Sequence, residues 1–282
     1  MTEQTFVQAK AWGANLVRVA LSESLWLTNS CTYSSGYEAK LDEAVNWITS
    51  LGMVALLNLE FNSPMPCQSG AQQEMADNPG SIEFWNQVAS RYGKNPLVAF
   101  DLYNEPHNIS DQVWLDGGQA TDTITYEAAG MQSLYDTVRA TGTQNLIFIS
   151  GNTWANTVPA TLVSGSNIVY SVHDYTCPTD PPPDCSSKAP YDPSPILDQW
   201  VTTSMTLPLV VGEFGWPNPN DATYIANVIA FAQANGWGWN ALAWNTSSGN
   251  PFALVSQAPG TGTWEPTASG MPVLAAMAGL AW

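Results

Sequence analysis

The chain has 282 residues, of which 45% are hydrophobic, so we expect one large domain over residues 1–282. It contains 7 Lys and Arg but 24 Asp and Glu, which gives a net charge of −17. Such a negative charge argues against nucleic acid and membrane surfaces as partners. Only 11% of the residues are charged, but 13 are Trp. Neutral polar groups and indole rings suit a ligand rich in hydroxyl groups, although large secreted proteins often share this composition.

The four cysteines indicate an oxidising compartment. None of them forms a CxxC pair, and with two histidines in the chain we expect no zinc site. Cys177 and Cys185 bracket a short proline-rich stretch and are expected to close a small loop. Cys31 and Cys67 each follow a predicted strand and would pair if those strands are neighbours. Two disulfides predict a secreted, extracellular protein, and we expect that a leader has been removed ahead of the polar segment after Met1.

Short apolar strands alternate with amphipathic helices along the chain. The predicted strands, in order, are Leu16–Leu21, Val54–Leu59, Leu97–Tyr103, Leu146–Ser150, Ile168–His173, Leu209–Gly212 and Trp237–Trp244. The predicted helices are Thr2–Gly13, Tyr37–Leu51, Ile82–Tyr92, Tyr126–Thr141, Ile196–Ser204, Ala222–Asn235 and Met271–Leu280.

This alternation predicts a parallel sheet buried on both faces, and the number of repeated units favours a (β/α)8 TIM barrel over an open sheet. Seven strands are predicted where a closed barrel needs eight. Because the first predicted element is a helix, we expect the missing strand to be the first one, upstream of Met1; the alternative is that another segment fills the gap.

Two glutamates are predicted at the carboxyl ends of strands, where the side chains of a parallel barrel converge. Glu105 follows the strand Leu97–Tyr103, and Glu213 follows Leu209–Gly212. Glycoside hydrolysis needs such a pair, one carboxyl to protonate the leaving oxygen and the other to attack the anomeric carbon. The alternative is that both are solvated or salt-bridged, and the small number of cations makes salt bridges the weaker explanation.

From about Phe6 to Leu280 the sequence resembles glycoside hydrolase family 5. The resemblance rests on four motifs, each at a predicted strand: NLVRVAL, DLYNEPH, VYSVHDY and VVGEFGW. It implies that Glu105 is the acid/base and Glu213 the nucleophile. It also implies that Asn104 hydrogen-bonds the sugar 2-hydroxyl and that Arg18 contacts the nucleophile carboxylate. For Arg18, a salt bridge at the rim of the core is the alternative.

The resemblance implies three further substrate-site residues. His173 and Tyr175 match a His-x-Tyr pair in which the His lies beside the acid/base and the Tyr beside the nucleophile. Trp244 matches the tryptophan under the sugar at the cleaved bond. Each has a structural alternative: a hydrogen-bonded core histidine for His173, simple packing for Tyr175, and barrel core for Trp244.

One predicted strand end departs from the family. Where the family usually carries Asp-x-His, this chain has Asn58, Leu59 and Glu60. Glu60 is expected to accept hydrogen bonds from sugar hydroxyls, and to disfavour ionisation of Glu105 if the two are close. A purely structural carboxylate is an equal alternative.

Two further tryptophans, Trp154 and Trp216, follow predicted strands directly and are expected to stack on sugars. Trp12 lies on a helix before a strand, so we expect it in the core.

These features predict a retaining endo-β-glycosidase that acts by double displacement, with the two carboxyls about 5 Å apart and no metal or organic cofactor. We expect a monomer whose partner is a polysaccharide. The overall resemblance to cellulases of the family implies that this polysaccharide is a β-1,4-glucan (an endoglucanase or cellulase). A β-mannanase and a β-1,3- or β-1,6-glucanase of the same family are the alternatives, and a non-catalytic carbohydrate-binding barrel is an alternative of another class. The excess of carboxylates also predicts stability at low pH, where protonation relieves their repulsion.

Overall fold

The structure is a computed structural model. It describes residues 2–64, 67, 70–121, 124–175, 193–215, 222–245, 250, 252–257 and 264–279. The chain forms two compact units, each described by itself. The N-terminal unit comprises Met1–Val7 and Asn15–Ser171, and the C-terminal unit comprises Gln8–Ala14 and Val172–Trp282.

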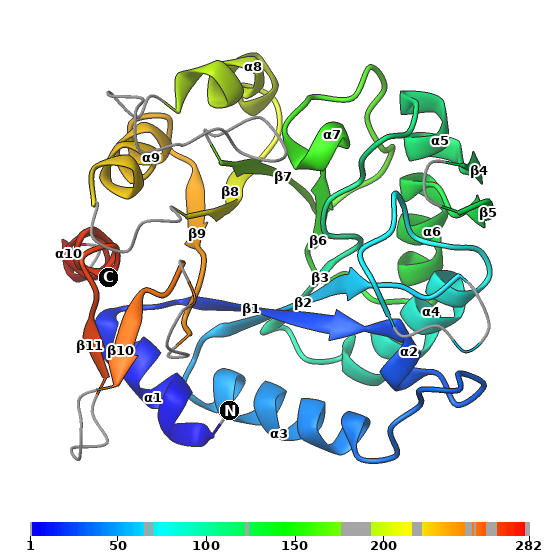
Figure 1. The fold of residues 1–282 in the computed structure, drawn as a ribbon, viewed down its shortest axis with the longest axis horizontal. Coiled ribbons are helices and arrows are strands. Elements are labelled where there is room, and N and C mark those ends of the chain that lie inside the picture. The colour runs from blue at the N-terminus through cyan, green and yellow to red at the C-terminus, as the bar shows by residue number, and fades with distance from the viewer. Residues whose placement is uncertain are drawn as a thin grey trace. The chain divides into compact units, whose positions relative to one another are not determined.

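A parallel sheet has seven strands in the order β1-β2-β3-β6-β7-β8-β9, which confirms the predicted β/α architecture (Figure 1). Its strands are β1 (Leu16–Ser22), β2 (Val54–Phe61), β3 (Val98–Asp101), β6 (Ile147–Ser150), β7 (Ile168–Asp174), β8 (Leu209–Phe214) and β9 (Gly238–Ala241). Strand β7 supplies Ile168–Ser171 to the N-terminal unit and its last three residues to the C-terminal unit.

Helices connect the strands in chain order, and the apolar periodicity predicts the longer ones but not the short helices Glu23–Trp26, Asp111–Asp116 and Asn152–Ala155. They are α1 (Glu3–Trp12), α2 (Glu23–Trp26), α3 (Tyr37–Ser50), α4 (Gly80–Tyr92), α5 (Asp111–Asp116), α6 (Met131–Ala140), α7 (Asn152–Ala155), α8 (Ser194–Ser204), α9 (Thr223–Ala234) and α10 (Gly270–Gly279). In the N-terminal unit, α3 packs on β2, and α4 packs against both α2 and α6. In the C-terminal unit, α9 packs on β8, β9 and α10.

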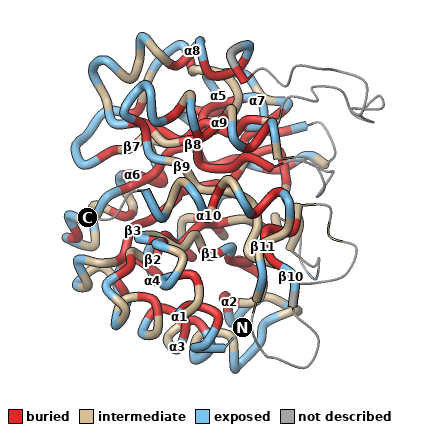
Figure 2. The backbone as a smooth tube through the Cα atoms, turned by 90° about the vertical axis from the view of Figure 1, so that its left-hand side faces the viewer, coloured by how far each residue is buried: buried red, intermediate tan, exposed pale blue. Residues whose placement is uncertain are grey.

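The central strands are buried on both faces because helices cover them. Every residue of β3 and β6 is buried, as are five consecutive residues of β2, whereas the outer faces of the helices are exposed (Figure 2). The indole of Trp85 on α4 packs edge-on against Phe100, with ring centroids 5.8 Å apart, and its N–H donates to the carbonyl of Leu102 at 2.9 Å. This contact holds the chain just beyond the end of β3.

The prediction of one helix over Tyr126–Thr141 is wrong in its first part. Residues Tyr126–Ala128 form strand β5, which pairs antiparallel with β4 (Gly118–Ala120). The backbone N–H of Ala129 donates to Ala76, and the Tyr126 hydroxyl donates to the carbonyl of Met75 at 2.6 Å. These contacts hold the segment extended, and the helix begins only after Gly130, whose backbone is also extended.

A second small antiparallel sheet, which the sequence does not predict, lies in the C-terminal unit. It pairs β10 (Val255–Gln257) with β11 (Trp264–Pro266). Helix α10 contacts β11, and the backbone of α10 at Met277 lies against Gly13. Gly13 has a φ of +106°, and a Cβ there would lie 2.9 Å from the Met277 carbonyl oxygen, so glycine is required.

A buried pair of carboxyl groups lies in the N-terminal unit, where α2 meets the start of α4. Glu23 and Asp77 are 2% and 4% exposed, and the Ser81 hydroxyl donates to Glu23 at 2.7 Å. Burial, followed by the charge of Asp77, raises the pKa of Glu23 to about 9. Glu23 is therefore protonated in the folded protein at neutral pH.

This pair predicts that stability falls as pH rises. The raised pKa means that the folded state keeps a proton that the unfolded chain loses above about pH 4.5. The contribution of Glu23 to the free energy of unfolding is therefore complete below that pH and declines as the pH rises to about 9. Glu23→Gln, which mimics the protonated carboxyl, should remove a slope of up to about 1.4 kcal/mol per pH unit. Urea unfolding at about pH 5 and about pH 8 measures this, with Glu43→Gln on the exposed face of α3 as the control. Equal pH slopes in wild type and Glu23→Gln would contradict it.

Candidate active site

The segment that carries Asn104 and Glu105 is held in line with the sheet, although β3 ends at Asp101 and not at Tyr103 as predicted. The backbone N–H of Asn104 donates to Leu59 at 3.0 Å, and that of Leu102 donates to Phe148 at 3.1 Å. Hydrogen bonds to both neighbouring strands therefore continue past the end of β3 and fix where the two side chains emerge.

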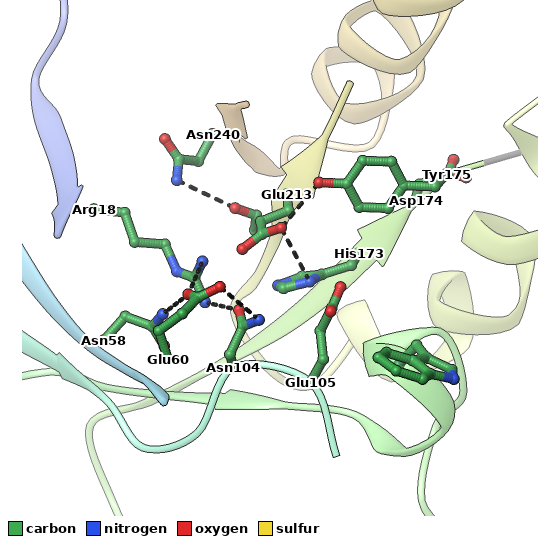
Figure 3. A network of polar contacts seen from close by, with 12 residues as sticks. Arg18, Asn58, Glu60, Asn104, Glu105, His173, Asp174, Tyr175, Glu213 and Asn240 are labelled. Carbon is green, nitrogen blue, oxygen red and sulfur yellow. Dashed lines mark hydrogen bonds and ion pairs between the residues drawn. The ribbon is translucent and has the colours of Figure 1, made fainter. Parts of the chain in front are cut away.

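Arg18 lies on β1 and is anchored by two neighbours (Figure 3). Its Nε donates to Asp101 at 2.7 Å, and its Nη2 donates to the side-chain oxygen of Asn104 at 2.7 Å. The side chains of Arg18 and Asp101 are 8% and 1% exposed, so each charge compensates the other in a site with little water. Asp101, which opens the DLYNEPH motif, is not among the residues that the sequence predicts for the site.

Glu60 lies within β2, and its carboxylate is engaged by protein side chains (Figure 3). It accepts from Asn58 at 2.6 Å and from the Asn104 amide nitrogen at 3.1 Å, and it lies 4.0 Å from Arg18. Arginine only donates and a carboxylate only accepts, so Arg18 and Glu60 together fix which end of the Asn104 amide carries the oxygen. The position that departs from the family pattern therefore supports Asn104.

The carboxyl of Glu105 is half-buried and accepts a hydrogen bond that the sequence did not reveal. The Gln72 amide nitrogen donates to Glu105 Oε2 at 2.7 Å. Gln72 lies 33 residues away in a loop with no regular pattern, so no periodicity placed it here.

Trp154 presents an exposed indole next to the Glu105 segment. Its ring stacks on His107 with centroids 3.6 Å apart and planes 12° apart, and 44% of the residue is exposed. The backbone N–H of Trp154 donates to Pro106 at 2.8 Å, and His107 Nδ1 lies 2.7 Å from the Glu105 carbonyl. Buried His107 thus supports an aromatic face that water can reach.

In the C-terminal unit, Glu213 is buried within β8, and not just after the strand as predicted (Figure 3). The Tyr175 hydroxyl donates to Glu213 Oε2 at 2.9 Å, which is the contact that the resemblance implies. Nδ1 of His173, which is fully buried, lies 3.7 Å from the same oxygen. The side-chain amide of Asn240 donates to the Gly212 carbonyl at 3.2 Å and ties β8 to β9 beside Glu213.

Trp244 lies three residues past the end of β9, which stops at Ala241 and not at Trp244 as predicted. Its ring is half-buried between two other indoles. Trp12 approaches it edge-on with centroids 4.8 Å apart, and Trp264 lies 5.5 Å away. Trp12, expected in the core, is itself only half-buried, and it braces Trp244.

Cys31 and Cys67 form a disulfide with Cα atoms 4.6 Å apart. Strands β1 and β2 pair with each other, so the condition set for this bond by the sequence analysis holds. Cys177, Cys185 and Trp216 lie outside the described residues.

In the described part of the chain, the groups that could contact a metal ion are Glu105 in the N-terminal unit and His173 and Glu213 in the C-terminal unit. Taken alone, neither unit brings three such groups together among its described residues. Among those residues, no helix has the length and apolar content that a membrane span requires.

The fold is a parallel β/α fold with one glutamate just beyond a strand. A second glutamate lies within another strand and accepts a hydrogen bond from a tyrosine. This combination is typical of the class of barrel glycoside hydrolases. Residues 1–248 match the model of the cellulase family, glycosyl hydrolase family 5. The chain belongs to this family.

Individual proteins are similar to this chain in sequence or in fold. Endoglucanase 3 of Humicola insolens is 27% identical over 222 residues, which cover 74% of this chain and 49% of the relative. The chain thus spans about half the length of this curated relative. The structure of the endo-β-1,4-glucanase from Xanthomonas axonopodis pv. citri is 17% identical with a TM-score of 0.73, covering 98% of this chain and 90% of that one. The structure of XacCel5A in complex with cellopentaose is also 17% identical, with a TM-score of 0.72. The match covers 97% of this chain and 90% of that one.

Proposed function

We propose that the chain is a retaining endo-β-1,4-glucanase in which Glu105 is the acid/base and Glu213 is the nucleophile. The observation that carries this proposal is that family membership coincides with the local chemistry of each glutamate. Glu213 accepts a hydrogen bond from Tyr175, and Glu105 follows an asparagine whose amide is fixed by Arg18 and Glu60.

The reaction has two steps. Glu213 attacks the anomeric carbon, the bond to the leaving oxygen breaks, and Glu105 gives its proton to that oxygen. Glu105 then takes a proton from water, the water oxygen bonds to the anomeric carbon, and the ester to Glu213 breaks. The product keeps the configuration of the substrate, and the sequence predicts no cofactor for either step.

Several neighbours are proposed to bind the sugar. The Asn104 amide has a second hydrogen beyond the one donated to Glu60, and we assign it to the sugar 2-hydroxyl. Trp154 and Trp244 supply aromatic faces for stacking. Tyr175 and His173 hold Glu213 for attack, and Arg18 acts through Asn104.

The choice of β-1,4-glucan follows the names of the relatives, which include an endo-β-1,4-glucanase and a structure with bound cellopentaose. We further propose that the two units together form one catalytic domain, that the protein is a monomer, and that it is secreted. The Cys31–Cys67 disulfide supports secretion because such bonds persist in oxidising compartments.

Reducing-sugar assays on carboxymethylcellulose, galactomannan and laminarin test the proposal. The expected result is hydrolysis of carboxymethylcellulose well above the other two, with NMR showing that the first product has the β configuration. Preferred hydrolysis of galactomannan or laminarin would move the assignment to a mannanase or a β-1,3-glucanase. Binding of the glucan without turnover would indicate a carbohydrate-binding barrel.

A further inference from the structure

The loop segment 71–74 runs beside the segment that carries Glu105 and is bonded to it on either side of that residue. The Tyr103 hydroxyl donates to the Gln73 carbonyl at 2.7 Å, and the His107 backbone N–H donates to Glu74 at 2.9 Å. Tyr103 is fully buried and His107 is 6% exposed, so both bonds are shielded from water. Gln72 is thereby held opposite Glu105.

The start of this loop segment is anchored independently. The backbones of Ala71 and Asn62 exchange two hydrogen bonds, at 3.1 and 3.0 Å, directly after β2. The Gly70 N–H donates to the Ser24 hydroxyl at 3.0 Å. The Cys31–Cys67 disulfide adds a covalent tie just before it. The backbone position of Gln72 is therefore set before any ligand binds.

The contact between the two side chains has a definite chemical consequence. The Gln72 amide nitrogen donates to Glu105 Oε2 at 2.7 Å, a length typical of a hydrogen bond to a charged acceptor. A donor aimed at a carboxylate stabilises the ionised form relative to the protonated form, and it also restricts the rotation of the carboxyl.

We propose that Gln72 is a positioning residue for Glu105, which orients its carboxyl and favours the ionised form that accepts a proton from water in the second step. This inference rests on the proposed function, because it assumes that Glu105 is the acid/base. It adds a residue outside the strand ends, delivered by a tethered loop.

The test compares wild type with Gln72→Met, which keeps the length of the side chain and removes the donor. Removing a donor that favours the ionised form should move the alkaline limb of the kcat/KM profile upward by about 0.5 to 1 pH unit, a partial effect because both groups are half-buried. NMR titration of the 13C-labelled Glu105 carboxyl, assigned with Glu105→Gln, should show the same upward shift without relying on activity.

A matched control is Gln112→Met, because Gln112 on the exposed face of α5 also donates to a carboxylate, that of Asp116. It should leave the Glu105 titration unchanged. Gln72→Glu is the second variant, and the like charge should move the titration further upward.

An unmoved Glu105 titration in a folded Gln72→Met protein overturns the inference, since it would show that the amide serves both protonation states equally. The same holds for an unmoved titration in Gln72→Glu, should Gln72→Met not fold. If Glu105→Gln kept full activity, the proposed function would fail, while the carboxyl titration would still report what Gln72 does to Glu105.

Discussion

Glu213→Ala is expected to lower kcat on a β-1,4-glucan by on the order of 10⁴-fold or more, because in the proposed mechanism the covalent intermediate forms on this carboxylate. The substitution leaves a space where the carboxylate was, next to the hydroxyl of Tyr175. Azide should enter this space and attack the anomeric carbon, restoring turnover of an aryl cellobioside that has an activated leaving group. The product should be the α-glycosyl azide, identified by NMR, since a single displacement inverts the configuration.

The control is Glu265→Ala, an exposed carboxylate on β11 in the same unit, which should keep wild-type rates. Circular dichroism should show that both variants are folded. Full activity of Glu213→Ala, or a β-glycosyl azide as its product, would remove Glu213 from the role of nucleophile.

Glu105→Ala should give a loss that depends on the leaving group. On carboxymethylcellulose, where the leaving oxygen needs a proton, we expect a fall of about 10²- to 10⁴-fold. The dinitrophenolate group of a dinitrophenyl cellobioside leaves without protonation. The first step on this substrate should therefore be nearly unaffected, and the glycosyl-enzyme should accumulate. Stopped-flow measurement of the burst of released phenol separates the two steps.

Azide again distinguishes the roles of the two glutamates. In Glu105→Ala it should attack the accumulated glycosyl-enzyme and yield the β-glycosyl azide, the opposite configuration to that from Glu213→Ala. Glu43→Ala, exposed on α3, serves as the control. An equal loss on both substrates, with no burst, would contradict the assignment of Glu105 as acid/base.

The fold was largely predictable because its main signal is local. Continuous apolar runs such as Val54–Leu59 become strands buried on both faces, and that burial depends little on distant residues. The predicted helix over Tyr126–Thr141 failed because partners about fifty residues away, at Met75 and Ala76, hold Tyr126–Ala128 extended. Side-chain periodicity carries no information about such partners.

The same distinction applies to the site. Glu105 and Glu213 follow from strand ends and motifs, which are local, and the structure places both at or just beyond a strand. The contact between Gln72 and Glu105, in contrast, depends on how a loop folds back. Gln72 reaches Glu105 because hydrogen bonds to the carbonyls of Gln73 and Glu74, among other anchors, hold its loop there, and no spacing in the sequence encodes that approach.

The pair formed by Glu23 and Asp77 has a wider meaning for the environment in which the chain works. At neutral pH the core of the N-terminal unit includes a hydrogen ion that the unfolded chain has released to the solvent. Acidification raises the proton concentration and therefore favours the folded state, which holds this proton. The same acidic conditions unfold proteins whose stability depends on ionised carboxylates. Protons from an acidic medium therefore act as a ligand that binds and stabilises the native state.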